Sequence, residues 1–189
     1  MTTPSDERSG HRAEIVQEGQ GATSVRPSGP LSDPEFVAGL RPIPAGPVDR
    51  HNGLPAHDID GVTPQGSALE IRLDGFDQLL LLAFLHTECD GCDEFWRGFA
   101  DGSGLMLPDA VSVIIVTKGP ESVDASAVIG VAAGVRRYSV VMSDAAWANY
   151  RVLGYPFFIL VDPSLRAIVG ETVGFGWSDV TSMIRSIRD

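Results

Sequence analysis

The spacing of apolar residues after residue 50 alternates between strand and helix patterns. Residues 68–73 alternate apolar with charged side chains, which predicts a strand buried on one face. Residues 79–85 and 111–116 are continuous apolar runs, which are typical of strands covered on both faces. Between these runs, apolar residues recur at the i, i+3, i+4 and i+7 positions of one helical face: Cys92, Phe95, Trp96 and Phe99.

The same alternation continues toward the end of the sequence. It predicts these further elements: helices at residues 123–133 and 144–153, strands at 139–142, 157–161 and 167–173, and a last helix capped by Ser178 or Asp179. A turn signal at Asp162, Pro163 and Ser164 indicates that the last two strands pair antiparallel. The order β-β-α-β-α-β-α-β-β-α predicts an α/β fold, with helices on both faces of a mostly parallel sheet that this last pair makes mixed.

Residues 1–50 have a different composition, rich in Pro, Gly, Ser, Thr and Glu. Phe36 is their only aromatic residue, and six prolines lie between Pro27 and Pro47. Such a segment buries too little apolar surface to offset the entropy lost on ordering. We therefore predict a disordered or weakly structured tail over residues 1–50, with at most one short helix at 32–40, followed by one domain over residues 51–189.

The charge balance narrows the choice of partners. The chain has 25 acidic and 14 basic residues, a net charge of −11 with neutral histidines. This disfavours nucleic acid and anionic membranes, because both are bound through Lys and Arg. The longest apolar run has seven residues, whereas a membrane-spanning helix needs about 20. We expect a monomer without membrane insertion, which is cytoplasmic if Met1 is the true start.

Cys89 and Cys92, the only cysteines, form a C-x-x-C motif between the predicted strand at 79–85 and the helix after it. The N-terminus of a helix presents free N–H groups and positive potential, which stabilise a thiolate. The first cysteine is the more exposed in this geometry and is the natural nucleophile, while the second is placed to attack a mixed disulfide. The motif therefore indicates dithiol redox exchange.

The cysteines have two other interpretations. Both could be inert, partly buried thiols. A zinc site would need four nitrogen or sulfur ligands, and His86 extends the motif to H-x-x-C-x-x-C without completing a tetrahedron. We therefore assign no residues to a metal site.

Acidic residues surround the motif: Glu88, Asp90, Asp93 and Glu94, with Arg97 as the nearest cation in sequence. This pattern favours a weak oxidant, or a reductant, that prefers a basic or neutral partner surface. Pro156, which starts the predicted strand at 157–161, is the second informative residue. X-Pro bonds at such places adopt the cis form more often than other bonds, and the backbone before them can pair with an extended substrate.

Together these residues resemble the thioredoxin superfamily, which has the order strand, C-x-x-C helix, strand, helix, then Gly-Tyr-Pro-Phe-Phe-Ile-Leu-Val-Asp, a hairpin and a final helix. Residues 53–61 resemble the first segment of its TlpA, ResA and MauD-like thiol-disulfide oxidoreductases. The resemblance spans residues 52–188 and implies a thioredoxin-like fold. It also implies that Cys89 is the nucleophile, Cys92 the resolving cysteine, Pro156 a cis-proline facing them, and Tyr155 a substrate contact.

The sequence departs from that family at the motif. Glu88 stands where an aromatic residue is usual, and Asp90-Gly91 fills the middle of the motif. Ala83 takes the place of a buried acid that helps to deprotonate the resolving thiol in many members. Members of this branch are usually anchored outside the cytoplasm, so the resemblance alone suggests an extracytoplasmic location.

We therefore expect a thiol-disulfide oxidoreductase without a bound cofactor. It exchanges its dithiol with the disulfide of a protein partner, and a separate protein donates or accepts the electrons. Two alternatives stay open: a redox-inactive thioredoxin-like module that binds proteins through its acidic rim and tail, and a metal-binding or metal-delivery protein.

Overall fold

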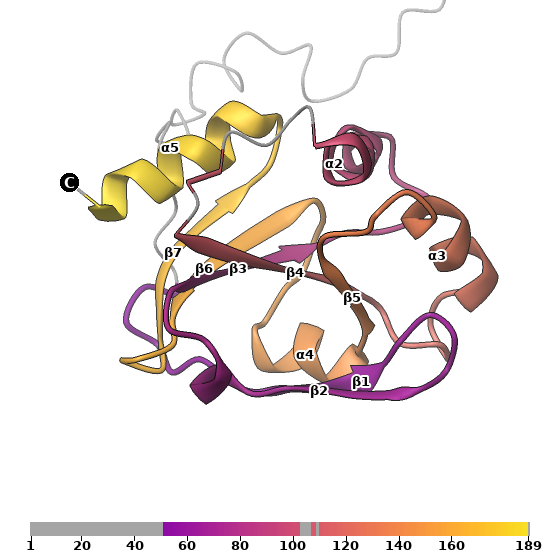
Figure 1. Cartoon of the computed structure of the whole chain (residues 1–189), viewed down its shortest axis with the longest axis horizontal. Coiled ribbons are helices and arrows are strands. Elements are labelled where there is room, and N and C mark those ends of the chain that lie inside the picture. Colours follow the sequence, from indigo (N-terminus) through magenta and orange to yellow (C-terminus); the bar gives the residue numbers. More distant parts are fainter. Residues whose placement is uncertain (1–50, 103–106, 109, 189) are drawn as a thin grey trace, which may run out of the picture. The chain divides into compact units, whose positions relative to one another are not determined.

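The structure, a computed structural model, describes residues 51–102, 107, 108 and 110–188. The tail predicted over residues 1–50, with its short helix at 32–40, lies outside the described residues. The described elements, with the labels of Figure 1, are β1 (Ile59–Val62), β2 (Ala68–Ile71), the 3-10 turn η2 (Leu73–Gly75), β3 (Leu79–Phe84), α2 (Asp90–Asp101), β4 (Val111–Thr117), α3 (Ala125–Ala132), β5 (Ser139–Met142), α4 (Asp144–Asn149), β6 (Phe157–Asp162), β7 (Ala167–Val173) and α5 (Trp177–Arg188).

In the described part of the chain the sheet has seven strands in the order β2-β1-β5-β4-β3-β6-β7. Strand β4 pairs parallel with both β3 and β5, whereas the other neighbouring strands pair antiparallel. The sheet is mixed, as predicted, but the expectation that it is mostly parallel is wrong. Strand β1, whose four residues include Gly61, was not predicted, and it pairs antiparallel with both of its neighbours.

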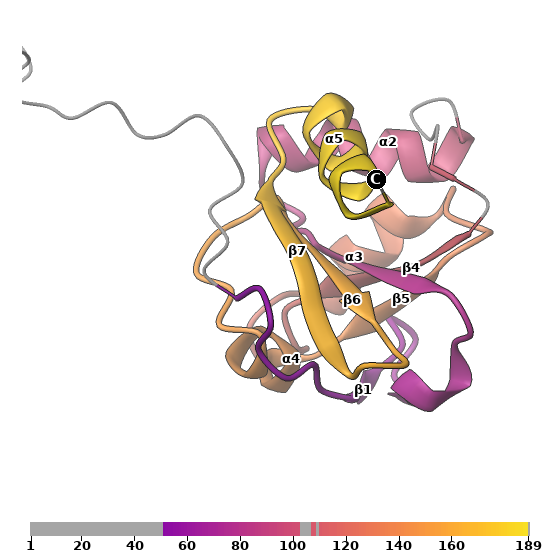
Figure 2. The same ribbon diagram turned by 90° about the vertical axis from the view of Figure 1, so that its left-hand side faces the viewer.

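Helices cover both faces of this sheet (Figures 1 and 2). Helices α2 and α5 lie on one face with α3 beside α2, and α4 lies on the opposite face. Strand β3 is apolar on both faces of the sheet, and its side chains alternate between two buried clusters. Both faces are therefore covered by helices. Leu80, Leu82 and Phe84 pack with α4, whereas Leu81 and Ala83 pack with α2 and α5. The helical face predicted from Cys92, Phe95, Trp96 and Phe99 is buried, as expected.

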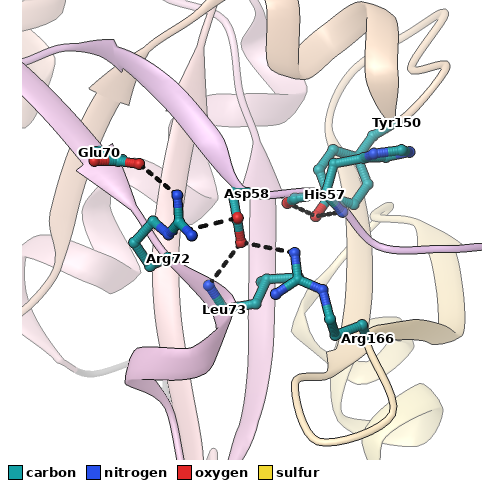
Figure 3. A network of polar contacts seen from close by, with 7 residues as sticks. All are labelled: His57, Asp58, Glu70, Arg72, Leu73, Tyr150 and Arg166. Carbon is teal, nitrogen blue, oxygen red and sulfur yellow. Dashed lines mark hydrogen bonds and ion pairs between the residues drawn. The ribbon is translucent and has the colours of Figure 1, made fainter.

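Helix α4 is shorter than predicted and ends at Asn149. Tyr150 caps it, and Arg151 then takes a left-handed conformation with φ of 51°. The buried Tyr150 hydroxyl donates a hydrogen bond to the carbonyl oxygen of His57 at 2.5 Å and accepts one from the His57 N–H at 3.0 Å. These two bonds tie the segment that leads into β1 to the end of α4 (Figure 3).

Asp58, next in sequence, joins three parts of the chain (Figure 3). Its carboxylate accepts hydrogen bonds from the Leu73 N–H at 2.9 Å and from the Arg166 guanidinium at 3.1 Å, and it lies 3.6 Å from the Arg72 guanidinium. The Leu73 N–H, and then the two arginines, lower the pKa of Asp58 despite its partial burial. This network fixes the segment before β1 against the sheet.

No helix in the described residues combines the length and the apolar character needed to cross a bilayer.

Candidate active site

Three segments that are distant in the sequence meet at the same end of three neighbouring strands. Phe84, the last residue of β3, pairs with Phe157 at the start of β6, and Phe157 pairs with Val173 at the end of β7. At this end of the strands, the loop to α2 leaves β3, Pro156 directly precedes β6, and Gly174 directly follows β7. The Gly174 N–H donates a hydrogen bond to the Pro156 carbonyl oxygen at 3.1 Å.

Cys89 is the N-cap residue of α2, so the motif lies at the start of this helix, as the sequence predicts. It has an extended backbone with φ of −139°, and its carbonyl oxygen accepts the first hydrogen bond, from the Cys92 N–H at 2.8 Å. The side chain of Cys89 makes no capping hydrogen bond and is partly exposed, and both cysteines are free thiols in this structure. Cys89 is therefore partly exposed beside the N–H groups of the first helical turn.

Cys92 lies one turn further along, fully buried beneath Cys89. Burial, followed by the hydrogen bond between the two thiols, raises the pKa of Cys92 to about 12. The backbone N–H of His86, which lies 3.5 Å from the Cys92 sulfur, acts in the opposite direction and is outweighed. The second thiol is thus held protonated at neutral pH, next to the partly exposed Cys89.

Pro156 lies beside the motif, as the resemblance implies, and the Tyr155–Pro156 peptide bond is cis. The structure brings Pro156 to Gly91: a Cβ atom added to Gly91 would lie 3.5 Å from Cδ of Pro156 and 3.8 Å from the sulfur of Cys89. The predicted set of Cys89, Cys92, Tyr155 and Pro156 therefore converges on one place. Tyr155 is partly exposed there, just before the buried proline.

His86 belongs to the site through contacts that its sequence position did not predict. Its ring stacks on Tyr155, its Nδ1 accepts a hydrogen bond from the Glu88 N–H at 3.1 Å, and its carbonyl oxygen accepts one from the Trp96 indole at 3.2 Å. The backbone N–H of His86 points to the sulfur of Cys92, and the His86 ring contacts Tyr155. His86 therefore connects the C-x-x-C motif to the segment before Pro156. Its place three residues before Cys89 was the one signal that the sequence offered.

Ala83, which stands where the resemblance to the thioredoxin superfamily leads one to expect a buried acid, lies in apolar surroundings. Ala83 is fully buried in β3, pairs with Ile115 and Phe158 on the neighbouring strands, and packs among apolar side chains. The acidic residues near the motif lie at the surface instead: Glu88, Asp90, Asp93 and Glu94. Ala83 therefore offers Cys92 no group that could accept its proton.

A metal centre would need several ligands close together. Among residues 51–102, 107, 108 and 110–188, no three His, Cys, Asp or Glu side chains are grouped so that they could hold a metal ion. The His86 ring is engaged with Tyr155 and with the Glu88 N–H.

No protein-family model and no curated protein sequence matches this chain. Solved structures do match. The thioredoxin domain of a thiol-disulfide oxidoreductase from Bacteroides vulgatus has a TM-score of 0.54 at 18% identity, covering 73% of this chain and 98% of that one. A thiol:disulfide interchange protein from a Bacteroides species has a TM-score of 0.52 at 17% identity, covering 73% and 91%. A thioredoxin-like protein from Aeropyrum pernix has a TM-score of 0.53 at 14% identity, covering 68% and 89%.

At such identities the likeness establishes the fold. The chain has a thioredoxin-like fold, as its sequence predicts, with a C-x-x-C motif at the start of α2. Its structural neighbours include thiol-disulfide oxidoreductases.

Proposed function

We propose that this protein is a thiol-disulfide oxidoreductase that exchanges the Cys89–Cys92 dithiol with the disulfide of a protein partner. One observation carries the proposal. The partly exposed Cys89 at the start of α2 lies one helical turn from the fully buried Cys92. This pairing suits a nucleophile and a resolving group better than two inert core thiols, which would both be buried.

The first step forms a mixed disulfide. The Cys89 thiolate attacks one sulfur of the partner's disulfide, the S–S bond breaks, and the other partner sulfur leaves as a thiolate that takes up a proton. The N–H groups of the first turn of α2 favour the negative charge on the attacking sulfur. The partner is then joined to the protein through Cys89.

The second step releases the partner. Cys92 loses its proton and attacks the sulfur of Cys89, a Cys89–Cys92 disulfide forms, and the second partner sulfur leaves as a thiol. Two electrons have passed to the partner. A separate dithiol protein restores the reduced form by the same steps in reverse, or the whole sequence runs backward if the partner is oxidised instead.

Tyr155 and Pro156 are proposed to hold the substrate. Tyr155 stands just outside the strand ladder, which begins at Phe157, and it is partly exposed next to the motif. An extended peptide that runs past this point can pair with the backbone and bring its sulfur to Cys89.

The test is turnover of a protein disulfide. The protein should accelerate the reduction of insulin by dithiothreitol, and Cys89→Ser should reduce this rate to the uncatalysed level. Cys92→Ser, which also replaces sulfur by oxygen, is the matched control. It should stop turnover but still allow Cys89 to form the mixed disulfide. Equal rates for Cys89→Ser and the parent protein, both shown to be folded by circular dichroism, would overturn the proposal and favour a redox-inactive binding module.

A further inference from the structure

Large apolar side chains are exposed just before β6 and just after β7, at the end of these strands where the motif lies. Tyr155 is 43% exposed, Leu153 two residues before it is 96% exposed, and Phe175 is 89% exposed. We call these three residues the apolar rim. Large apolar side chains that gather on one part of a surface mark an interaction site more often than isolated ones do.

The fold holds Phe175 next to the Pro156 segment. On one side of Phe175, the Gly174 N–H bonds to the Pro156 carbonyl oxygen at 3.1 Å. On the other side, a Cβ atom added to Gly176 would lie 3.9 Å from the carboxylate of Glu94 in α2. The Phe175 N–H donates to the Asp179 carboxylate at 2.9 Å, which fixes the loop. Phe175 therefore lies between the proline and the first turns of α2.

Negative charge lies on the α2 side of the same surface. Four exposed acids, which we call the acidic rim, precede or open the helix: Glu88, Asp90, Asp93 and Glu94. Arg97, the cation of this helix, donates its Nε to the Asp93 carbonyl oxygen at 3.2 Å. On the α4 side, Lys118 lies 3.9 Å from the Asp144 carboxylate and over the Trp147 ring, so this cation has an acidic neighbour of its own.

We infer that the partner presents its reactive sulfur in an extended segment that carries both basic and large apolar side chains. This inference rests on the proposed function and names the substrate class for the same site. Apolar side chains of the partner cover the apolar rim, and Lys or Arg side chains face the acidic rim. An acidic segment is repelled, so selection between partners acts mainly on the rate of association.

The experiment uses three peptides of equal length, each with one cysteine joined as a mixed disulfide to the neutral thiol 2-mercaptoethanol. Their flanks carry Lys and Leu, Lys and Ser, or Glu and Leu. With reduced protein at low salt, the Lys–Leu peptide should react about tenfold faster than the Glu–Leu peptide. In about 1 M salt, where the screening length is about 3 Å, most of that difference should disappear.

Two variants assign the effect to the two rims. Glu94→Lys should reduce the preference for Lys over Glu at least about threefold. The matched control is Asp77→Lys, which makes the same charge change at an exposed site before β3, at the opposite end of that strand from the motif. It should leave the preference unchanged. Phe175→Ser should instead remove the preference for Leu over Ser, and its exposed position means that the fold is retained.

A small neutral disulfide, 2-hydroxyethyl disulfide, separates this inference from the proposed function. If the reduced protein does not react with it, or if Cys89→Ser reacts equally, the proposed function fails. If the protein reacts with it but reduces the Lys and Glu peptides at equal rates, the redox function stands and the inferred partner chemistry is wrong. Equal effects of Glu94→Lys and Asp77→Lys would likewise overturn the role of the acidic rim.

Discussion

The imidazole ring of His86 stacks on the phenol ring of Tyr155, with the ring centroids 4.6 Å apart and an angle of 13° between the planes. His86 lies between β3 and the C-x-x-C motif, whereas Tyr155 precedes Pro156. The same imidazole accepts the N–H of Glu88, the residue directly before Cys89. One side chain thus joins the two segments that form the site, and we interpret His86 as a positioning residue.

Replacing His86 should therefore impair protein substrates more than small ones. We expect His86→Ala to lower kcat/KM for a peptide disulfide several-fold, with little change for 2-hydroxyethyl disulfide, and to cost about 1 kcal/mol of the free energy of unfolding.

Two further variants separate the two contacts. His86→Phe keeps a ring for the stack, and His86→Asn keeps an acceptor for the N–H two residues later. Each should recover part of the rate with peptides. If all three variants lose stability but keep the parental ratio of peptide to small-disulfide rates, His86 is merely structural.

The release of the mixed disulfide should depend steeply on pH. Burial raises the pKa of the Cys92 thiol to about 12, so at neutral pH almost all of it is protonated and inactive as a nucleophile. The release rate should rise about tenfold per pH unit from about pH 7 to 9, because the thiolate fraction does. Rapid acid quenching and mass measurement follow this step. A rate that levels off below about pH 8 would show that the resolving thiol is activated.

Tyr150→Phe should loosen the segment before β1. The variant leaves the N–H and the carbonyl oxygen of His57 without their partner hydroxyl, which costs about 1–3 kcal/mol of the free energy of unfolding at neutral pH. Urea unfolding measures this cost. No loss of stability would mean that water replaces the hydroxyl without penalty.

Tyr150→Phe should also change how folding stability depends on pH in the alkaline range. Burial raises the pKa of Tyr150 from 10.0 to about 12. In that window the unfolded chain loses the phenol proton while the folded protein keeps it, so folding stability falls as pH rises from about 10 to 12. Tyr150→Phe should therefore show a shallower alkaline loss than the parent protein. An identical slope for both would contradict a raised pKa.

Gly98 and Gly130 form a matched pair of helical glycines. A Cβ atom on Gly98 of α2 would lie 2.7 Å from the ring of Trp177, whereas one on Gly130 of α3 would meet nothing within 4 Å. Gly98→Ala should lower the free energy of unfolding by about 1–3 kcal/mol through overpacking. Gly130→Ala should raise it by up to about 1 kcal/mol through helix propensity. Thermal unfolding compares the two, and equal effects would mean that Trp177 moves aside.

The sequence predicted most of the fold because its strands and helices are strongly periodic. Strand β1 was missed because four residues with a central glycine carry too little pattern, and β1 changes the balance of parallel and antiparallel pairs. The cysteines and Pro156 were found through motif and resemblance. The stack of His86 on Tyr155 could not be found in this way, since it depends on β3 and β6 being neighbours and on side-chain directions that no local pattern encodes.

The central claim is that Cys89 attacks a partner's disulfide and Cys92 resolves the product. Its most direct test treats reduced Cys92→Ser with the Lys–Leu peptide disulfide, quenches with acid and maps the adduct by mass spectrometry. The account predicts close to one peptide per chain, joined to Cys89, and only a transient adduct in the parent protein, which ends as a Cys89–Cys92 disulfide. An unmodified Cys89 in the folded variant, or an adduct that persists equally in the parent protein, would contradict it.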